Sequence, residues 1–123
     1  MTTGSGEYSK RSGLVRGATN CYMDKGTASH TGGGAEDATI TLNKGTTRWV
    51  RKVEIAAPSF TGSESVAIYK DSVAAANLLA DGYLLPSGVF EFRNPISGTG
   101  NLICRVTSTT ASTVYINVDY DYA

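Results

Sequence analysis

The chain has 123 residues, with eleven basic and eleven acidic side chains, so it is long enough for one domain and has no net charge to attract nucleic acid or anionic membranes. Its fourteen glycines favour turns and extended chain over helices. No apolar run approaches the roughly 20 residues of a membrane span, and the first residues lack the order of a signal peptide, so we expect the chain to stay in the cytosol where it is made.

Residues 1–36 are predicted to form an extended or flexible arm. Among Leu, Ile, Val and Phe, this stretch contains only Leu14 and Val15. So little apolar surface cannot offset the cost of ordering the backbone, about 1–2 kcal/mol per residue. We therefore expect the arm to gain structure only on contact with neighbouring subunits or a larger partner. The candidate contact residues in it are of types favoured at interfaces, namely Tyr8, Arg11, Leu14, Arg16 and Tyr22.

Residues 37–123 are predicted to form a β-sandwich domain. From Ala38 onward apolar and polar residues alternate, which is typical of strands with one face in a core and the other in water. Seven or eight such runs, with all three prolines between them, indicate an all-β, antiparallel, jelly-roll-like sandwich. The predicted core is Ile55, Ile68, Phe90, Phe92, Leu102, Val106, Ile116 and Val118.

Three connections are predicted from turn residues and composition. Asp81-Gly82, between two short apolar runs, is a typical hairpin signal. The stretch 71–79 includes three consecutive alanines, so it is compatible with one or two helical turns. Ser108 to Ser112 is predicted to be the loop that joins the last two strands.

Residues able to do chemistry are sparse, and the sequence predicts a protein that is not an enzyme and has no cofactor or metal. The single histidine, His30, falls in the predicted arm and is interpreted as a solvated bystander. Asp119 and Asp121 share one face of a strand, which fits Ca²⁺ binding or glycoside chemistry less well than a plain polar face. Cys21 and Cys104 match no metal spacing and are predicted to be unpaired thiols, the alternative being a disulfide that ties the arm to the core.

The most distinctive local feature is the run 44–52, which holds four basic residues and the only tryptophan. Arg and Trp are the residue types that most often supply interface energy, so Arg48, Trp49 and Arg51 are candidate interface residues. The alternative is that Trp49 caps one end of the core among solvated basic neighbours. Specific nucleic-acid binding ranks below both because the net charge is zero.

The end of the chain resembles small jelly-roll virion proteins of tailed bacteriophages, in particular capsid decoration (cement) proteins. The resemblance is carried by the long hairpin of Gly100-Asn101-Leu102-Ile103-Cys104-Arg105-Val106-Thr107 and Thr113-Val114-Tyr115-Ile116-Asn117-Val118-Asp119-Tyr120, together with Phe90-Glu91-Phe92-Arg93-Asn94-Pro95-Ile96. The resemblance is one of general strand pattern over residues 38–123, and it includes no diagnostic motif. It implies a structural protein of the virion, made in the host cytoplasm, that binds the major capsid protein on the outside of the shell. It also implies a homo-oligomer, commonly a trimer, and no catalytic residues.

Two alternatives remain at this stage. One is a carbohydrate-binding or host-recognition module, with Tyr83, Tyr115 and Trp49 as a platform for sugars. The other is a different position in the virion, such as a neck, tail or head-fibre component. Sandwich folds host many functions, so the fold class does not separate these alternatives.

Overall fold

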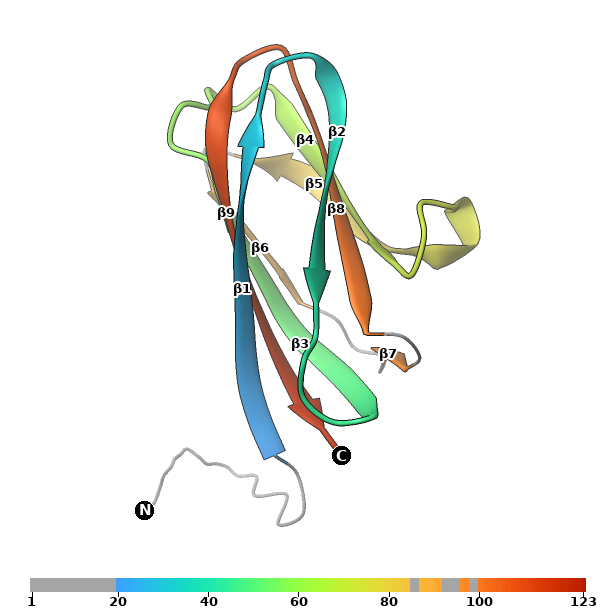
Figure 1. The fold of residues 1–123 in the computed structure, drawn as a ribbon. Helices are drawn as coiled ribbons and strands as arrows, with labels where there is room; N and C mark the ends of the chain where they lie inside the picture. The colour runs from blue at the N-terminus through green and yellow to red at the C-terminus, as the bar shows by residue number, and fades with distance from the viewer. Residues whose placement is uncertain (1–19, 85–86, 92–95, 98–99) are drawn as a thin grey trace.

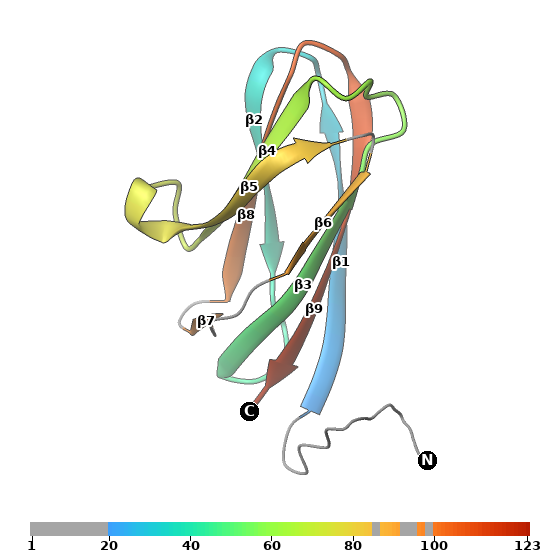
Figure 2. The same cartoon turned by 180° about the vertical axis from the view of Figure 1, so that it is seen from behind.

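The computed structural model describes residues 20–84, 87–91, 96–97 and 100–123, which form two antiparallel sheets packed face to face (Figures 1 and 2). The first sheet has the spatial order β1 (Asn20–His30), β9 (Ser112–Tyr122), β3 (Thr47–Ala56) and β6 (Ser87–Glu91), and the short β7 (Ile96–Ser97) also pairs with β3. The second sheet has the order β2 (Gly34–Thr41), β8 (Asn101–Ser108), β4 (Glu64–Lys70) and β5 (Leu78–Leu84). No helix in this part of the chain is long and apolar enough to cross a membrane.

The strand pairs are nested, which defines a jelly roll. Strand β1 pairs with β9, β2 with β8, β3 with β6 and β4 with β5, and all four pairs are antiparallel. The chain therefore has the topology of one long hairpin wrapped around the core, in which successive strand pairs lie alternately in the first and the second sheet. The predicted all-β, jelly-roll-like sandwich is confirmed.

The core lies between the two sheets and is built from the inward positions of the alternating runs. Six predicted core residues are at most 2% exposed, and Phe90 is only partly buried against the core. Phe92 lies outside the described residues. The six buried residues are Ile55, Ile68, Leu102, Val106, Ile116 and Val118.

The structure differs from the sequence prediction at the start of the domain, because residues 20–36 lie in the sandwich and not in an arm. Strand β1 pairs with β9 in continuous register from Asn20–Tyr122 to His30–Ser112. The inward positions of β1 include Gly26, where an added Cβ would lie 2.5 Å from Cδ1 of Ile40. The strand is held by backbone pairing and close approach and not by large apolar side chains. Residues 1–19, including Tyr8, Arg11, Leu14 and Arg16, lie outside the described residues.

The predicted hairpin at Asp81-Gly82 is wrong, because both residues lie inside strand β5, paired with Ala67 and Val66 of β4. Gly82 makes no turn here and packs closely against a side chain of β6. A Cβ on Gly82 would lie 3.1 Å from Cε1 of Phe90, whose ring fills the space above it. The actual turn before β5 is a short 3-10 helix, Ala75–Asn77, within the stretch where a helical turn was one alternative.

A buried carboxylate holds the loop that enters β4. Glu64 is 2% exposed, and its side chain accepts hydrogen bonds from the backbone N–H of Thr61 (3.0 Å) and Gly62 (2.7 Å). Burial raises the pKa of Glu64, but these hydrogen bonds outweigh it and leave the pKa below its ordinary value of 4.5.

This carboxylate should make the stability of the domain depend on pH. A group whose pKa is lowered by folding stabilises the folded state above its unfolded pKa and ceases to do so as the pH falls through the folded value. We expect the wild-type melting temperature to fall as the pH drops below about 4.5, by more than that of Glu64→Gln. Thermal melts of both proteins between neutral and acid pH measure the difference, and parallel curves would contradict the assignment.

Candidate interface

Four of the predicted interface residues lie at one end of the first sheet, where β1 and β3 begin and β9 ends. In the register, Arg48 pairs with Tyr122 on β9, and Trp49 pairs with Asp121. Cys21, beside Tyr22 on β1, pairs with the same Asp121 from the other side. Figure 1 shows that β1 starts beside the C-terminus at this end. We call the group made by Tyr22, Lys44, Arg48, Trp49 and Arg51 the terminal cluster.

Tyr22 and Lys44 lie on the side of this end that faces the second sheet. Both contact Tyr120, which is the centre of a hydrogen-bond network. The Tyr22 and Tyr120 rings meet edge to face at 6.1 Å, and Nζ of Lys44 lies 5.0 Å above the Tyr22 ring. The Tyr120 hydroxyl donates a hydrogen bond to Oδ2 of Asp24 at 2.5 Å and accepts one from the backbone N–H of Lys44 at 3.1 Å. These contacts hold a half-exposed aromatic ring and a cation in a fixed arrangement.

The contacts of this network shift the pKa values of Tyr120 and Asp24. Burial, together with the hydrogen bond to Asp24, raises the pKa of Tyr120 to about 12. Burial raises the pKa of Asp24 as well, but its hydrogen bonds from Tyr120 and Asn43 outweigh this and leave the pKa lowered. The tyrosine therefore stays protonated as a donor and the aspartate stays ionised as its acceptor.

A β-bulge brings two basic side chains to the outer face of the cluster. The register between β3 and β9 shifts between Val50 and Lys52, so that Val50 and Val53 are both buried while Arg51 and Lys52 both reach the surface. Nε of Arg51 lies 3.1 Å from Oδ1 of Asp121. Trp49, on the same strand, is half-buried, so part of its ring remains accessible.

The two carboxylates of β9 are therefore partners of these basic groups. Lys52 pairs with Asp119 at 3.6 Å, as Arg51 does with Asp121. Within the described ranges, no group of three His, Cys, Asp or Glu residues is arranged to hold a metal ion. The geometry fits the polar face predicted as the main interpretation, with each carboxylate held in an ion pair.

Arg48 lies on the face of β3 opposite to Trp49, and it contacts the loop between β2 and β3. Its Nε donates a hydrogen bond to the carbonyl of Lys44 at 3.1 Å. Its guanidinium also lies close to Gly100, whose positive φ of 83° and close approach favour a glycine. Of the four predicted residues that the structure describes, Tyr22 and Arg51 are exposed, whereas Arg48 and Trp49 are half-buried.

No disulfide joins Cys21 to Cys104, as predicted, and the two thiols differ sharply in accessibility. Cys104 is fully buried, and burial raises the pKa of its thiol to about 12. Cys21 is exposed, and its Sγ lies 3.2 Å from Oδ1 of Asp121.

This contrast predicts two thiol populations. Since the thiolate is the reactive species, one thiol should react rapidly in the native protein and the second only on unfolding. Titration with a chromogenic thiol reagent, with and without denaturant, measures this, and Cys21→Ser should remove only the fast phase. Two equally fast thiols in the native protein would contradict the placement of Cys104.

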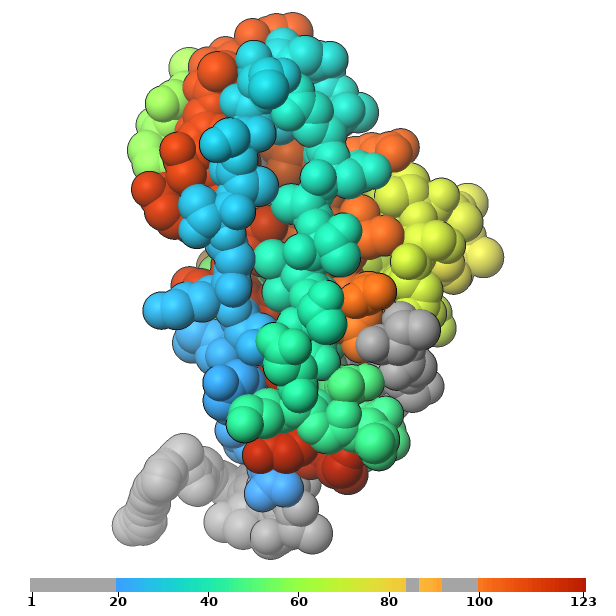
Figure 3. Space-filling view, in the orientation of Figure 1, coloured from blue at the N-terminus to red at the C-terminus, as the bar shows by residue number. Residues whose placement is uncertain are grey.

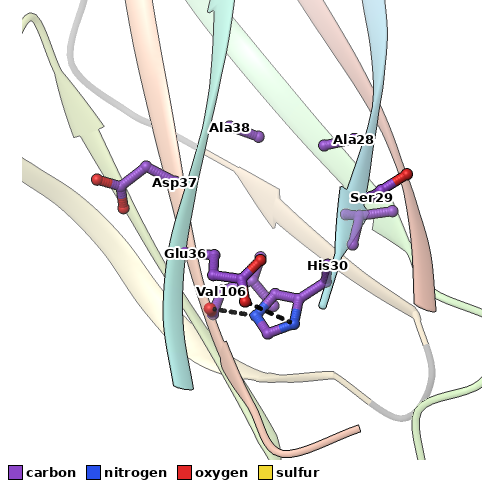
Figure 4. Close-up of a pocket in the computed structure, with 8 residues that line it drawn as sticks. Ala28, Ser29, His30, Glu36, Asp37, Ala38 and Val106 are labelled. Atoms are coloured by element: carbon purple, nitrogen blue, oxygen red, sulfur yellow. Dashed lines mark hydrogen bonds and ion pairs between the residues drawn. The ribbon is translucent and has the colours of Figure 1, made fainter. Parts of the chain in front are cut away.

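His30, expected to be a solvated bystander, is instead buried at the opposite end of β1 and is 5% exposed (Figure 4). Its Nε2 lies 2.9 Å from the Val106 carbonyl and 3.0 Å from the Gly34 carbonyl, so Nε2 carries the proton and donates. Its Nδ1 accepts from the N–H of Gly32 at 3.0 Å. Both ring nitrogens are thus committed to backbone groups, and the imidazole fixes the turn between β1 and β2 to β8.

The space beside His30 is too small for a substrate. A cavity of about 30 Å³ lies between β1 and β2, lined by Ala28, His30, Glu36 and Val106 among others. The two strands run side by side across this face of the molecule (Figure 3). Glu36 is used by the turn, since it accepts hydrogen bonds from Thr31 and from the N–H of Gly33. The arrangement provides room for about one water molecule and no nucleophile with a free base.

The described residues thus form a single jelly-roll domain, and the comparisons with known proteins bear on that fold. No family model matches the chain, and no curated protein matches it. Among solved structures, a chain of the cyanophage Pam1 capsid asymmetric unit has the same fold, with a TM-score of 0.53, 15% sequence identity and 98% coverage of both chains.

Proposed function

We propose that the protein is a structural component of a phage virion that binds the outer surface of the capsid as a decoration or cement protein. The observation that supports this most is the likeness to the cyanophage capsid chain across 98% of both chains. Since the likeness covers nearly all of both, the matched chain is also a short, single jelly roll.

The terminal cluster supports the proposal by supplying a contact surface. It combines an accessible tryptophan, a half-exposed tyrosine under a lysine and an arginine at a bulge, which are the residue types that dominate interface energies. Residues 1–19 join the sandwich at Asn20, directly beside this cluster. The predicted arm, with Tyr8, Arg11, Leu14 and Arg16, would therefore extend the same contact surface onto the capsid or a neighbouring copy.

Co-sedimentation with capsids that lack the protein tests the proposal. We expect the wild-type protein to bind at a fixed number of copies per particle. Arg51→Glu and Trp49→Ala should each weaken binding by about tenfold or more, as hot-spot truncations do. Lys70→Glu, at the end of β4 in the other sheet, is the matched control and should bind as the wild type does. Circular dichroism melts confirm that each variant is folded.

Three results would contradict the proposal. Capsids that bind no wild-type protein would argue against the decoration role, and binding to isolated tails or necks would indicate another position in the virion. Equal binding by the wild type and both cluster variants would move the interface away from the terminal cluster. Sedimentation equilibrium on the free protein tests the homo-oligomer, expected to be a trimer, which is part of the same proposal.

A further inference from the structure

The outer face of the second sheet contains a groove that the proposed capsid contact does not use. The groove has a volume of about 460 Å³, within the roughly 300–1,000 Å³ typical of ligand pockets. Its lining residues belong to β8, β4 and β5, whereas the strands of the terminal cluster belong to the first sheet. Figure 2 shows β8, β4 and β5 in the layer opposite β1, β9 and β3. The outward-facing lining residues of the groove are Ser65, Ala67, Tyr69, Asp81, Tyr83, Arg105 and Thr107, and Val66 and Gly82 also line it.

The hollow follows from one small residue in the middle of a cross-strand row. Asp37, Arg105, Ala67 and Asp81 stand opposite one another on β2, β8, β4 and β5. Ala67 lies between Arg105 and Asp81, whose side chains are longer. The sheet surface is therefore hollowed at Ala67 and raised at both neighbours. Side chains on one face of a strand recur at every second residue. Tyr69, two residues after Ala67, therefore lies at one end of the hollow, and Ser65, two residues before it, lies at the other end with its partner Tyr83.

The groove offers ring faces together with hydrogen-bonding groups. Tyr83 is 71% exposed, the most exposed of the large hydrophobic side chains in the described residues. Ser65 and Thr107 add hydroxyls, and within the described ranges the exposed Asp81 carboxylate has no ion-pair partner. Aromatic rings pack against the apolar faces of sugar rings, while carboxylates and hydroxyls accept and donate to sugar hydroxyls.

The charges of the groove favour a neutral ligand. Arg105 is held by Asp37 through two hydrogen bonds, Nε to Oδ1 at 2.8 Å and Nη2 to Oδ2 at 3.1 Å. The pKa of Arg105 is raised by this pairing, so the guanidinium remains charged and committed to Asp37. Asp81 then leaves the groove with a net negative charge, which disfavours acidic sugars and phosphates.

We propose that this groove binds a neutral oligosaccharide, with Tyr83 stacking on a sugar ring and Asp81 accepting from its hydroxyls. This goes beyond the proposed capsid attachment and does not depend on it. If the terminal cluster faces a capsid, the groove on the other sheet stays open to solvent and is available for polysaccharides on a cell surface.

Titration of the isolated, isotopically labelled protein by NMR tests the proposal, with maltohexaose, mannohexaose and chitohexaose as probes. We expect at least one of the three to shift amide resonances of the groove, centred on Ala67 and Tyr83, with saturation. Tyr83→Ala and Asp81→Asn should each weaken that binding by about tenfold or more. Tyr115→Ala is the matched control, because Tyr115 is 49% exposed on the outer face of the first sheet, and it should bind as the wild type does.

The contradicting results are equally specific. No shift with any of the three probes, or shifts confined to residues outside the groove, would overturn the proposal. Equal weakening by Tyr115→Ala would show that the sugars bind exposed tyrosines without a site. Tighter binding of a sulfated or uronic-acid oligosaccharide would overturn the neutral class of ligand. Because the assay contains no capsid, none of these results bears on the attachment proposal.

Discussion

Deletion of residues 1–30 is expected to unfold the domain, while deletion of residues 1–19 leaves it folded. The longer deletion removes the whole of β1, whose eleven residues pair with β9. Each backbone hydrogen bond contributes about 0.5–1.5 kcal/mol, so the loss is comparable with the roughly 5–15 kcal/mol that stabilises a typical domain. The inward side of β9, including the fully buried Tyr120, would also lose its cover.

Thermal melts and dispersed NMR spectra of the two truncated proteins measure this contrast. The shorter deletion removes only the part of the predicted arm that precedes β1, so the melting temperature should stay near that of the wild type, while capsid binding weakens. A protein that lacks residues 1–30 yet melts like the wild type would show that β1 does not contribute to the folded core.

The second large effect is expected from Ile116→Ala, which should lower the free energy of unfolding by about 2–5 kcal/mol. Ile116 is 1% exposed in β9, and in the register it pairs with Gly26 on one side and Ile55 on the other. Truncation leaves a cavity that these neighbours have little freedom to fill. Tyr115→Ala, one residue earlier, removes more atoms from the outer face and is the matched control.

Urea denaturation of both variants measures the two effects. We expect a much lower midpoint for Ile116→Ala and a change within about 0.5 kcal/mol for Tyr115→Ala, as is usual for surface substitutions. Similar losses in the two variants would contradict the alternation of faces along β9.

Period-two alternation predicted most of the sandwich, and the places where it failed have physical reasons. The inward positions of β1 hold polar or small residues such as Asp24, Gly26 and His30, so the strand lacks an apolar pattern. Asp24 accepts a hydrogen bond from the Tyr120 hydroxyl, and His30 donates one to the Val106 carbonyl, and both partners are more than 70 positions away in sequence. Such long-range partners cannot be read from local composition.

Glycine misled the prediction in β5 for a related reason. Asp81-Gly82 has the composition of a tight turn, but Gly82 is small because the Phe90 ring occupies the space above it. The pairing of β5 with β4, which makes the dipeptide part of a strand, depends on the wrapping of the whole chain. The local sequence shows that a glycine can adopt a turn conformation, but it does not show whether the glycine lies in a turn or packs against a side chain in a strand.

The candidate interface was predicted as two separate pieces, Tyr22 in an arm and Arg48, Trp49 and Arg51 in a strand. Residue types identified both pieces, but only the pairing of β1 and β3 with the two edges of β9 places them together. Lys44 was part of the basic run, and its position above the Tyr22 ring follows from the loop between β2 and β3. The groove on the second sheet had one sequence signal, Tyr83, which was considered together with residues of the opposite sheet.

A cryo-EM reconstruction of capsids saturated with the purified protein tests the central claim most directly. We expect one jelly-roll density at each symmetry-related site on the outer surface. In that density the end of the first sheet that carries Tyr22 of β1 and Trp49 and Arg51 of β3 should face the shell. The β8–β4–β5 face should point to solvent. Particles without added density, or a jelly roll whose β1 start points away from the shell, would contradict it.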